Sequence, residues 1–161
     1  MSSGAAWARA MAVAAVVIAA DQVTKALVRQ HVERGSHDAV FPGVDLVNVR
    51  NNGVAFGLFS NGKAPVILLT GAALLALIVY FALHTGKAGL WFPTGLLLGG
   101  ALGNIIDRVR HDAVTDFLDL PLWPAFNLAD VSITLGVLAL LYVLEAPREK
   151  KKRGEADPSP T

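Results

Sequence analysis

The chain has 161 residues, of which 53% are hydrophobic and only 17% carry a charge. One soluble core of this length cannot bury so much apolar surface, so the composition favours a protein that crosses a membrane several times. The formal net charge of +1 gives no reason to expect a nucleic-acid partner. The absence of cysteine excludes disulfides, thiolate metal ligands and a cysteine nucleophile.

The N-terminal segment combines a basic residue with an apolar run. Arg9 is followed by the apolar residues 10–20, a pattern that a secretory signal peptide would also show. Asp21 and Lys25 come next and apolar residues then resume, so we favour a membrane helix over residues 6–29. Because Asp21 and Lys25 are four residues apart, they share one helix face. They form either a surface ion pair or a polar face turned into a helix bundle.

Residues 31–63 form a polar, glycine-containing segment. Residues 33–38 are typical of a loop, and residues 44–50 alternate in the manner of a strand. Asn51, Asn52 and Gly53 then indicate a turn or a bulge, because Asn and Gly tolerate positive φ. The simplest interpretation is a hairpin on the membrane surface.

Two further apolar runs predict membrane helices over residues 64–83 and 90–107. A short polar turn joins them and makes them antiparallel. In the second run, glycines recur every four residues and let another helix backbone approach closely. They are Gly95, Gly99 and Gly103. Asn104 and Arg108 share a face at the end of this run, where Arg108 either reaches the interface or supplies a charge to a site.

A second polar loop is expected over residues 111–125, followed by a last membrane helix over residues 126–144. The acidic residues of the loop are Asp112, Asp116 and Asp119. In the last helix, Asn127, Asp130 and Thr134 form one polar stripe. An ionised aspartate that faced lipid would cost about 3 kcal/mol, so we expect Asp130 to face the interior of the bundle.

The C-terminal residues 147–161 are rich in Pro, Lys and Glu and are expected to be disordered. The dense run of basic residues between positions 148 and 153 predicts a cytoplasmic tail by the positive-inside rule. Four spans then place the N-terminus in the cytoplasm as well. The two polar segments, with Asn51 and Asp116, are expected on the outer side.

Five short motifs follow one another along the chain. They read D-Q-V-T-K from Asp21, R-N-N-G-V-A-F from Arg50, G-G-A-L-G-N-I-I-D-R from Gly99, V-T-D-F from Val114 and F-N-L-A-D from Phe126. In this order and at these spacings they closely resemble the motifs of the lipoprotein signal peptidases, also called signal peptidase II. Val54 and Gly57 stand where that family often has Ala and Ser, a departure that bears only on local packing.

The resemblance implies an intramembrane aspartic endopeptidase of the bacterial cytoplasmic membrane, with Asp116 and Asp130 as the catalytic pair. Its substrate would be a lipid-modified prolipoprotein, cut just before the diacylglyceryl-bearing cysteine. One aspartate would activate a water while the other, protonated, polarises the scissile carbonyl, and the sequence does not say which does which. The implied fold is an all-α, four-helix membrane bundle with a small β-rich cradle on the outer side, formed by residues 1–146. The residues implied to orient the dyad or to bind substrate are Asp21, Lys25, Asn51, Gly53, Asn104, Arg108, Asn127 and Ala129.

Other classes of site have weaker support. Ser60 and Lys63 are close in sequence but lie in a loop, and the four histidines are scattered, so we expect no serine–lysine dyad, metal or cofactor. We expect a monomer whose partners are the prolipoprotein and membrane lipid. The alternative is a small non-enzymatic channel or transporter subunit with carboxylates along an ion path. The polar residues crowd toward one face of the membrane, which favours the peptidase.

Overall fold

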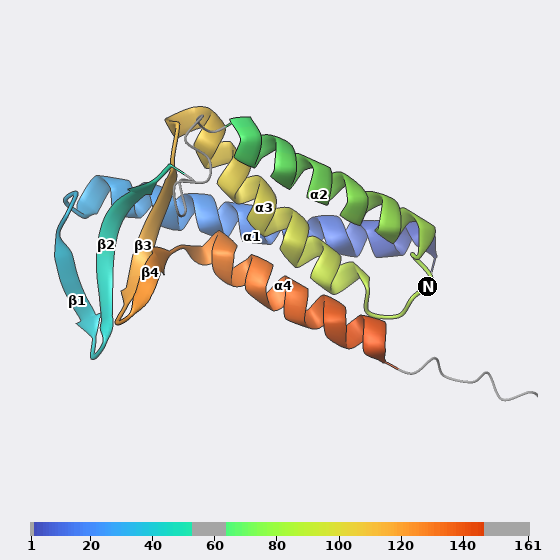
Figure 1. The fold of residues 1–161 in the computed structure, drawn as a ribbon. Helices are drawn as coiled ribbons and strands as arrows, with labels where there is room; N and C mark the ends of the chain where they lie inside the picture. The colour runs from blue at the N-terminus through green and yellow to red at the C-terminus, as the bar shows by residue number, and fades with distance from the viewer. Residues whose placement is uncertain (1, 53–63, 147–161) are drawn as a thin grey trace, which may run out of the picture.

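The computed structural model describes residues 2–52 and 64–146, which form four helices and four strands. In chain order these are α1 (Ser3–His31), β1 (His37–Phe41), β2 (Val44–Asn51), α2 (Ala64–Leu83), α3 (Trp91–His111), β3 (Val114–Leu120), β4 (Trp123–Phe126) and α4 (Leu128–Glu145). The helices run side by side, and the strands form one sheet at one end of them (Figure 1).

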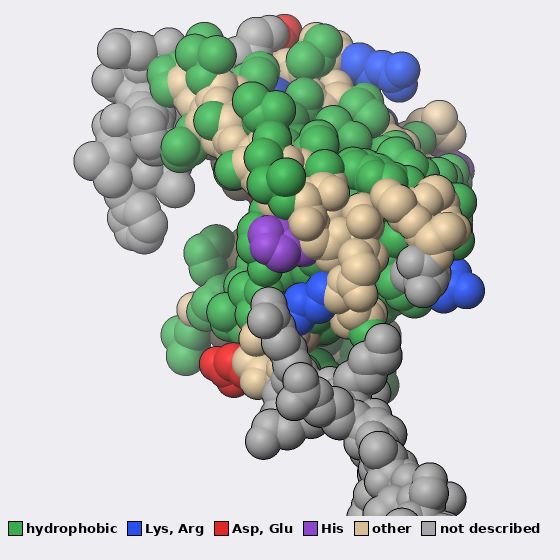
Figure 2. All heavy atoms as spheres, turned by 90° about the vertical axis from the view of Figure 1, so that its right-hand side faces the viewer, with side chains coloured by type: hydrophobic (Ala, Val, Ile, Leu, Met, Phe, Trp, Pro, Cys, Tyr) green, Lys and Arg blue, Asp and Glu red, His purple; other side chains and the backbone are tan. Residues whose placement is uncertain are grey.

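Three of the described helices, α1, α2 and α4, are long and apolar enough to cross a membrane. The outer surface of α2 is strongly apolar, with Leu68 and Leu83 73% and 75% exposed. Figure 2 shows hydrophobic side chains over most of the end of the molecule that lies away from the sheet, with few charged groups among them. So much exposed apolar surface is stable in a hydrocarbon environment and is costly in water. The chain is therefore a multi-pass membrane protein.

Helix α3 contacts each of the other three helices and lies between α1 and α4. The predicted packing role of its glycines is confirmed. A Cβ atom added at Gly99 would lie 2.7 Å from the Cβ of Val17, and one added at Gly103 would lie 2.7 Å from Oδ2 of Asp21. Side chains of α1 therefore pack directly against the backbone of α3, which brings the polar residues of α1 close to α3.

The sheet is antiparallel with the strand order β1-β2-β3-β4. Its central pair joins β2 to β3, which α2 and α3 separate in the sequence. Asn51 lies opposite Val114 and Val49 lies opposite Asp116. A cluster of Val28, Val32 and Phe117 packs this sheet against the end of α1. The pairing brings the end of β2 beside Asp116.

The predicted helices are present with small shifts of their ends, and the predicted strand over residues 44–50 is confirmed as β2. The expectation of a loop over residues 111–125 is wrong, because β3 and most of β4 lie there. Strand β1 begins at His37, inside the loop that was expected over residues 33–38. Strands β1 and β3 pair with β2, and β4 pairs with β3, so their partners, and not a local pattern, determine them. Gly53, Ser60 and Lys63 lie outside the described residues.

Candidate active site

Two aspartates and three asparagines from four elements meet where the sheet joins the helices. Asp116 lies on β3, Asp130 in the first turn of α4 and Asn127 at the start of that helix. Asn51 ends β2 and Asn104 lies on α3. The sheet thus supplies one carboxyl group and the helices supply the other.

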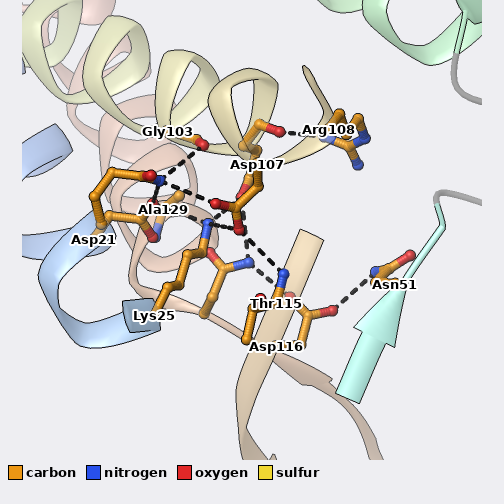
Figure 3. Close-up of polar contacts among 12 residues, drawn as sticks. Asp21, Lys25, Asn51, Gly103, Asp107, Arg108, Thr115, Asp116 and Ala129 are labelled. Atoms are coloured by element: carbon orange, nitrogen blue, oxygen red, sulfur yellow. Dashed lines mark hydrogen bonds and ion pairs between the residues drawn. The ribbon is translucent and has the colours of Figure 1, made fainter. Parts of the chain in front are cut away.

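The Asp116 side chain is only 2% exposed, and amide groups hold both of its oxygens. Nδ2 of Asn127 donates to Oδ1 at 2.7 Å, and Nδ2 of Asn51 donates to Oδ2 at 2.9 Å (Figure 3). Burial raises the pKa of Asp116 from 3.8 to about 6, and the negative charge of Asp130 acts in the same direction. The two amide hydrogen bonds and the charge of Lys25 lower the pKa but do not offset burial.

Asp130 is half-buried and accepts two hydrogen bonds at the amino end of α4. Nδ2 of Asn104 donates to its Oδ1 at 2.8 Å, and the backbone N–H of Asn127 donates to its Oδ2 at 3.2 Å. The amino end of a helix carries partial positive charge and favours a carboxylate. Both oxygens of Asp130 are therefore held by hydrogen bonds.

The orientation of the Asn104 amide follows from Lys25 on α1. The Lys25 ammonium group, 2.8 Å from Oδ1 of Asn104, can only donate hydrogen bonds. The oxygen of Asn104 must therefore face Lys25, which leaves Nδ2 to face Asp130. Nδ2 of Asn127 also reaches Oδ1 of Asn104, at 3.3 Å. Lys25 thus fixes the direction of a hydrogen-bond chain that ends at the dyad.

Lys25 belongs to a buried ion cluster. Its Nζ lies 2.9 Å from Asp21 and 3.3 Å from Asp107, and all three side chains are fully buried. Asp21 and Lys25 thus form a polar face turned into the bundle and not a surface pair. Asp107, which the sequence placed only at a helix end, is a functional candidate that sequence reasoning missed. Its spacing of three from Asn104 puts the two on one helix face and could have revealed it.

Arg108 lies beside the dyad. Its Nη1 donates to the backbone oxygen of Asn104 at 3.3 Å, and its charge interacts with Asp116 and Asp130. Its Nε is buried and has no hydrogen-bond partner among the described residues. A buried, unpartnered N–H beside two carboxyl groups is a donor available to a bound peptide.

An apolar cavity of about 500 Å³ opens beside Asp130. Residues of β4 and of the first turns of α4 line it, including Trp123, Phe126, Val131 and Leu135. The cavity is large enough to take an apolar side chain or part of an acyl chain.

The other loop acids, Asp112 and Asp119, are more exposed than Asp116. Asp112 follows α3 with φ 62°. Asp119 lies on the sheet with His37 and Asp45, where one ligand atom from each falls within 4.8 Å of the others. These three side chains are the described residues that come nearest to a metal-ligand set. All three are partly or largely exposed, and none contacts Asp116 or Asp130 in the described network.

A family model described as signal peptidase (SPase) II matches residues 13–145. The chain belongs to the signal peptidase II family. It is 39% identical over 143 residues to a lipoprotein signal peptidase of Pelotomaculum thermopropionicum, covering 88% of this chain and 94% of that protein. It is 42% identical over 134 residues to that of Oleidesulfovibrio alaskensis, covering 77% and 86%. A solved structure of a bacterial membrane enzyme, determined by the in meso method at 2.3 Å resolution, is similar with a TM-score of 0.77 and 34% identity, covering 92% and 94%.

Most of the site residues predicted from the sequence motifs lie close together around Asp116 and Asp130. Asn51, Asn104 and Asn127 contact the two aspartates, and Lys25 reaches them through Asn104. Asp21 and Ala129 lie one step further away, joined to each other by a hydrogen bond. Gly53 lies outside the described residues. Gln22 and Thr115, which contact Asp107, were not predicted.

Proposed function

We propose that this chain removes signal peptides from lipid-modified prolipoproteins, cutting just before the diacylglyceryl-bearing cysteine with Asp116 and Asp130 as its catalytic pair. Membership of the signal peptidase II family supports the reaction class. The observation that carries the residue assignment is that Asn127 contacts both aspartates, donating from Nδ2 to Asp116 and from its backbone N–H to Asp130. Two carboxyl groups held this way can act on one peptide bond.

The different surroundings of the two aspartates suggest different roles. Asp116 is the acid, because burial raises its pKa to about 6. Asp130 is the base, because two donors and the amino end of α4 favour its carboxylate form. This division applies to the free enzyme, in which the pair shares one proton.

The reaction then proceeds by general acid–base catalysis. Asp130 takes a proton from water as the water oxygen attacks the scissile carbonyl carbon, and Asp116 gives its proton to the carbonyl oxygen. When the carbon–nitrogen bond breaks, Asp130 returns its proton to the leaving nitrogen. Asp116 recovers a proton from the hydroxyl group of the intermediate as the new carboxyl group forms. Both carboxyl groups end in their starting states.

The neighbouring polar residues hold the peptide and the dyad. Asn51, Asn104 and Asn127 orient the carboxyl groups through the hydrogen bonds described above. Arg108, with its free Nε, donates to a carbonyl oxygen of the bound chain. Ala129 helps to orient the dyad through its backbone N–H, which donates to Asp21. The cavity beside Asp130 receives an apolar part of the precursor.

The membrane arrangement is also part of the proposal. Residues 1–146 form one domain in the bacterial cytoplasmic membrane, with α3 as a fourth spanning helix, and the basic residues that follow lie in the cytoplasm. The sheet is a cradle on the outer face, so the dyad meets exported precursors there. The enzyme acts as a monomer and without a cofactor. The polar groups of the dyad gather at one end of the helices and not along a path through them, which does not favour a channel.

The reaction is tested with the purified full chain in detergent. The probe is a synthetic precursor peptide that carries a diacylglyceryl-cysteine, and the matched control has the same sequence with unmodified cysteine. We expect cleavage on the amino side of the lipidated cysteine and at least tenfold slower cleavage of the control. Equal rates for both peptides would contradict the proposed substrate class. No cleavage of either would contradict the reaction itself.

A further inference from the structure

The residues that directly precede Asp116 and Asp130 in the sequence each donate a backbone N–H to a carboxylate of the buried ion cluster. The N–H of Ala129, which precedes Asp130, donates to Oδ1 of Asp21 at 3.0 Å. The N–H of Thr115, which precedes Asp116, donates to Oδ2 of Asp107 at 3.1 Å (Figure 3). Each proposed catalytic residue is therefore attached, through the backbone N–H of the residue before it, to one acid of the cluster.

One cation joins these two acids. Nζ of Lys25 lies 2.9 Å from Oδ2 of Asp21 and 3.3 Å from Oδ2 of Asp107, and it is fully buried. Gln22 reinforces the bridge, because its Nε2 donates to Oδ2 of Asp21 and to Oδ1 of Asp107, each at 3.2 Å. The half-buried Arg29 lies 3.7 Å from Asp107 and balances the second negative charge.

Stability alone explains this cluster poorly. A buried ion pair loses so much hydration that apolar residues of similar volume often serve the fold as well or better. The cluster lies on two elements, α1 and α3, that already meet through Gly99 and Gly103. What the cluster does fix is the position of β3 relative to the first turn of α4, the two segments that carry the dyad.

We propose that Lys25 is a positioning residue that sets the separation of Asp116 and Asp130. It does so by holding together Asp21 and Asp107, the two carboxylates that accept from the N–H groups just before the dyad residues. The inference rests on the proposed dyad and adds the reason for its geometry. Lys25 also fixes the Asn104 amide that donates to Asp130, so one ammonium group acts on the dyad by three routes. Without it, Asp21 and Asp107 repel each other and separate α4 from β3.

The first test replaces Lys25 with methionine, which has a similar length and no charge. We expect KM to stay within about twofold and kcat to fall about 100-fold, because a displacement of about 1 Å at a reacting centre costs this much. A role in folding alone would lower the amount of folded enzyme and leave kcat per folded molecule unchanged. The matched control is Lys87→Met. Lys87 lies in the turn between α2 and α3, donates to the backbone oxygen of Leu144 at the end of α4, and does not touch the dyad.

Lys25→Met leaves two buried carboxylates without their cation, so a second variant removes all three charges. Asp21→Asn/Lys25→Met/Asp107→Asn keeps oxygen acceptors for both peptide groups and leaves no unpaired charge in the cluster core. We expect it to remain monodisperse in detergent and to show the same fall in kcat at an unchanged KM. Wild-type kcat in a folded variant would overturn the proposal. So would a triple variant that does not fold, because the cluster would then be needed for stability.

The same assay includes Asp116→Asn and Asp130→Asn. Continued cleavage by either of these would show that the dyad assignment itself has failed. Loss of cleavage in both, together with a normal kcat for the Lys25 variants, would contradict the positioning role alone.

Discussion

Asn127 and Asp130 hydrogen-bond each other reciprocally at the start of α4. Oδ1 of Asn127 accepts from the N–H of Asp130 at 3.0 Å, and Oδ2 of Asp130 accepts from the N–H of Asn127 at 3.2 Å. This is a capping box, a common way to begin a helix. Here the same Asn127 side chain also donates to Asp116 at 2.7 Å. The capping box that begins the helix therefore also joins the two carboxyl groups of the proposed dyad.

The first prediction concerns this double role. Asn127→Ala removes the cap of α4, worth about 1 kcal/mol, and one of the donors to Asp116. We expect a small drop in Tm and a fall in kcat of at least tenfold for the lipidated precursor. The control is Ser2→Ala, because Ser2 caps α1 far from the dyad through its bond from Ala5. Equal effects of the two variants on kcat would mean that Asn127 acts only as a cap.

The second prediction concerns pH. The pKa of Asp116 is raised to about 6, so its carboxyl group is protonated below that pH and loses its proton above it. If Asp116 is the acid, kcat/KM falls on the alkaline side as this proton is lost, with an apparent pKa that belongs to the pair. Its hydrogen bond from Asn51 favours the ionised form, so Asn51→Leu should raise the pKa and move the alkaline limb to higher pH.

The charged groups that act on Asp116 are Asp130, Lys25 and Arg108, and the Asn51 variant leaves all of them in place. The matched control is Asn48→Leu on the same strand, since Asn48 donates to Val32 and not to Asp116. Its alkaline limb should stay at the wild-type position. A limb that moves to lower pH in Asn51→Leu would reverse the assignment of acid and base.

The third prediction tests the close approach of α1 and α3. A Cβ atom at Gly103 would lie 2.7 Å from Oδ2 of Asp21, so Gly103→Ala must displace that carboxylate or the helix. We expect a destabilisation of about 1–3 kcal/mol, measured as a lower Tm, together with reduced cleavage. Gly71→Ala on α2 is the control, because nothing lies within 4 Å of the new methyl group. It should leave Tm unchanged or raise it slightly.

The fourth prediction concerns orientation. A cysteine introduced at Ser36, next to the sheet, should react with an impermeant thiol reagent in intact cells. A cysteine at Ser159, in the basic tail, should react only after the cells are opened, because the positive-inside rule places that tail in the cytoplasm. The chain has no cysteine of its own, so each label reports one position. The reverse pattern would contradict an active site on the outer face.

Much of the fold follows from local patterns. The apolar runs predict four helices close to their observed ends, and the glycine spacing predicts the contact that Gly99 makes with α1. The predicted polar stripe is confirmed for Asn127 and Asp130, which face the protein, but its third member, Thr134, is exposed. These patterns repeat within a few residues, so the sequence alone displays them.

The remainder depends on contacts between distant segments. Strands β1 and β3 are determined by pairing with β2, and β4 by pairing with β3, so the segment around Asp116 was mistaken for a loop. The partners of the buried Asp107, Lys25 and Thr115, come from other elements, so its spacing of three from Asn104 was the one local sign of its role. The choice of Asp116 over its neighbours Asp112 and Asp119 came from the motif resemblance and not from residue spacing.

The most direct test of the account measures cleavage of the lipidated precursor by Asp116→Asn, Asp130→Asn and Asp112→Asn, each purified in detergent and compared at equal amounts of folded protein. Asp112 follows α3 with positive φ, a conformation that asparagine also tolerates, so its variant is a control of the same chemical change. We predict background cleavage for the first two variants and at least partial activity for Asp112→Asn. Cleavage by Asp116→Asn or Asp130→Asn at a rate near that of Asp112→Asn would contradict the aspartate dyad.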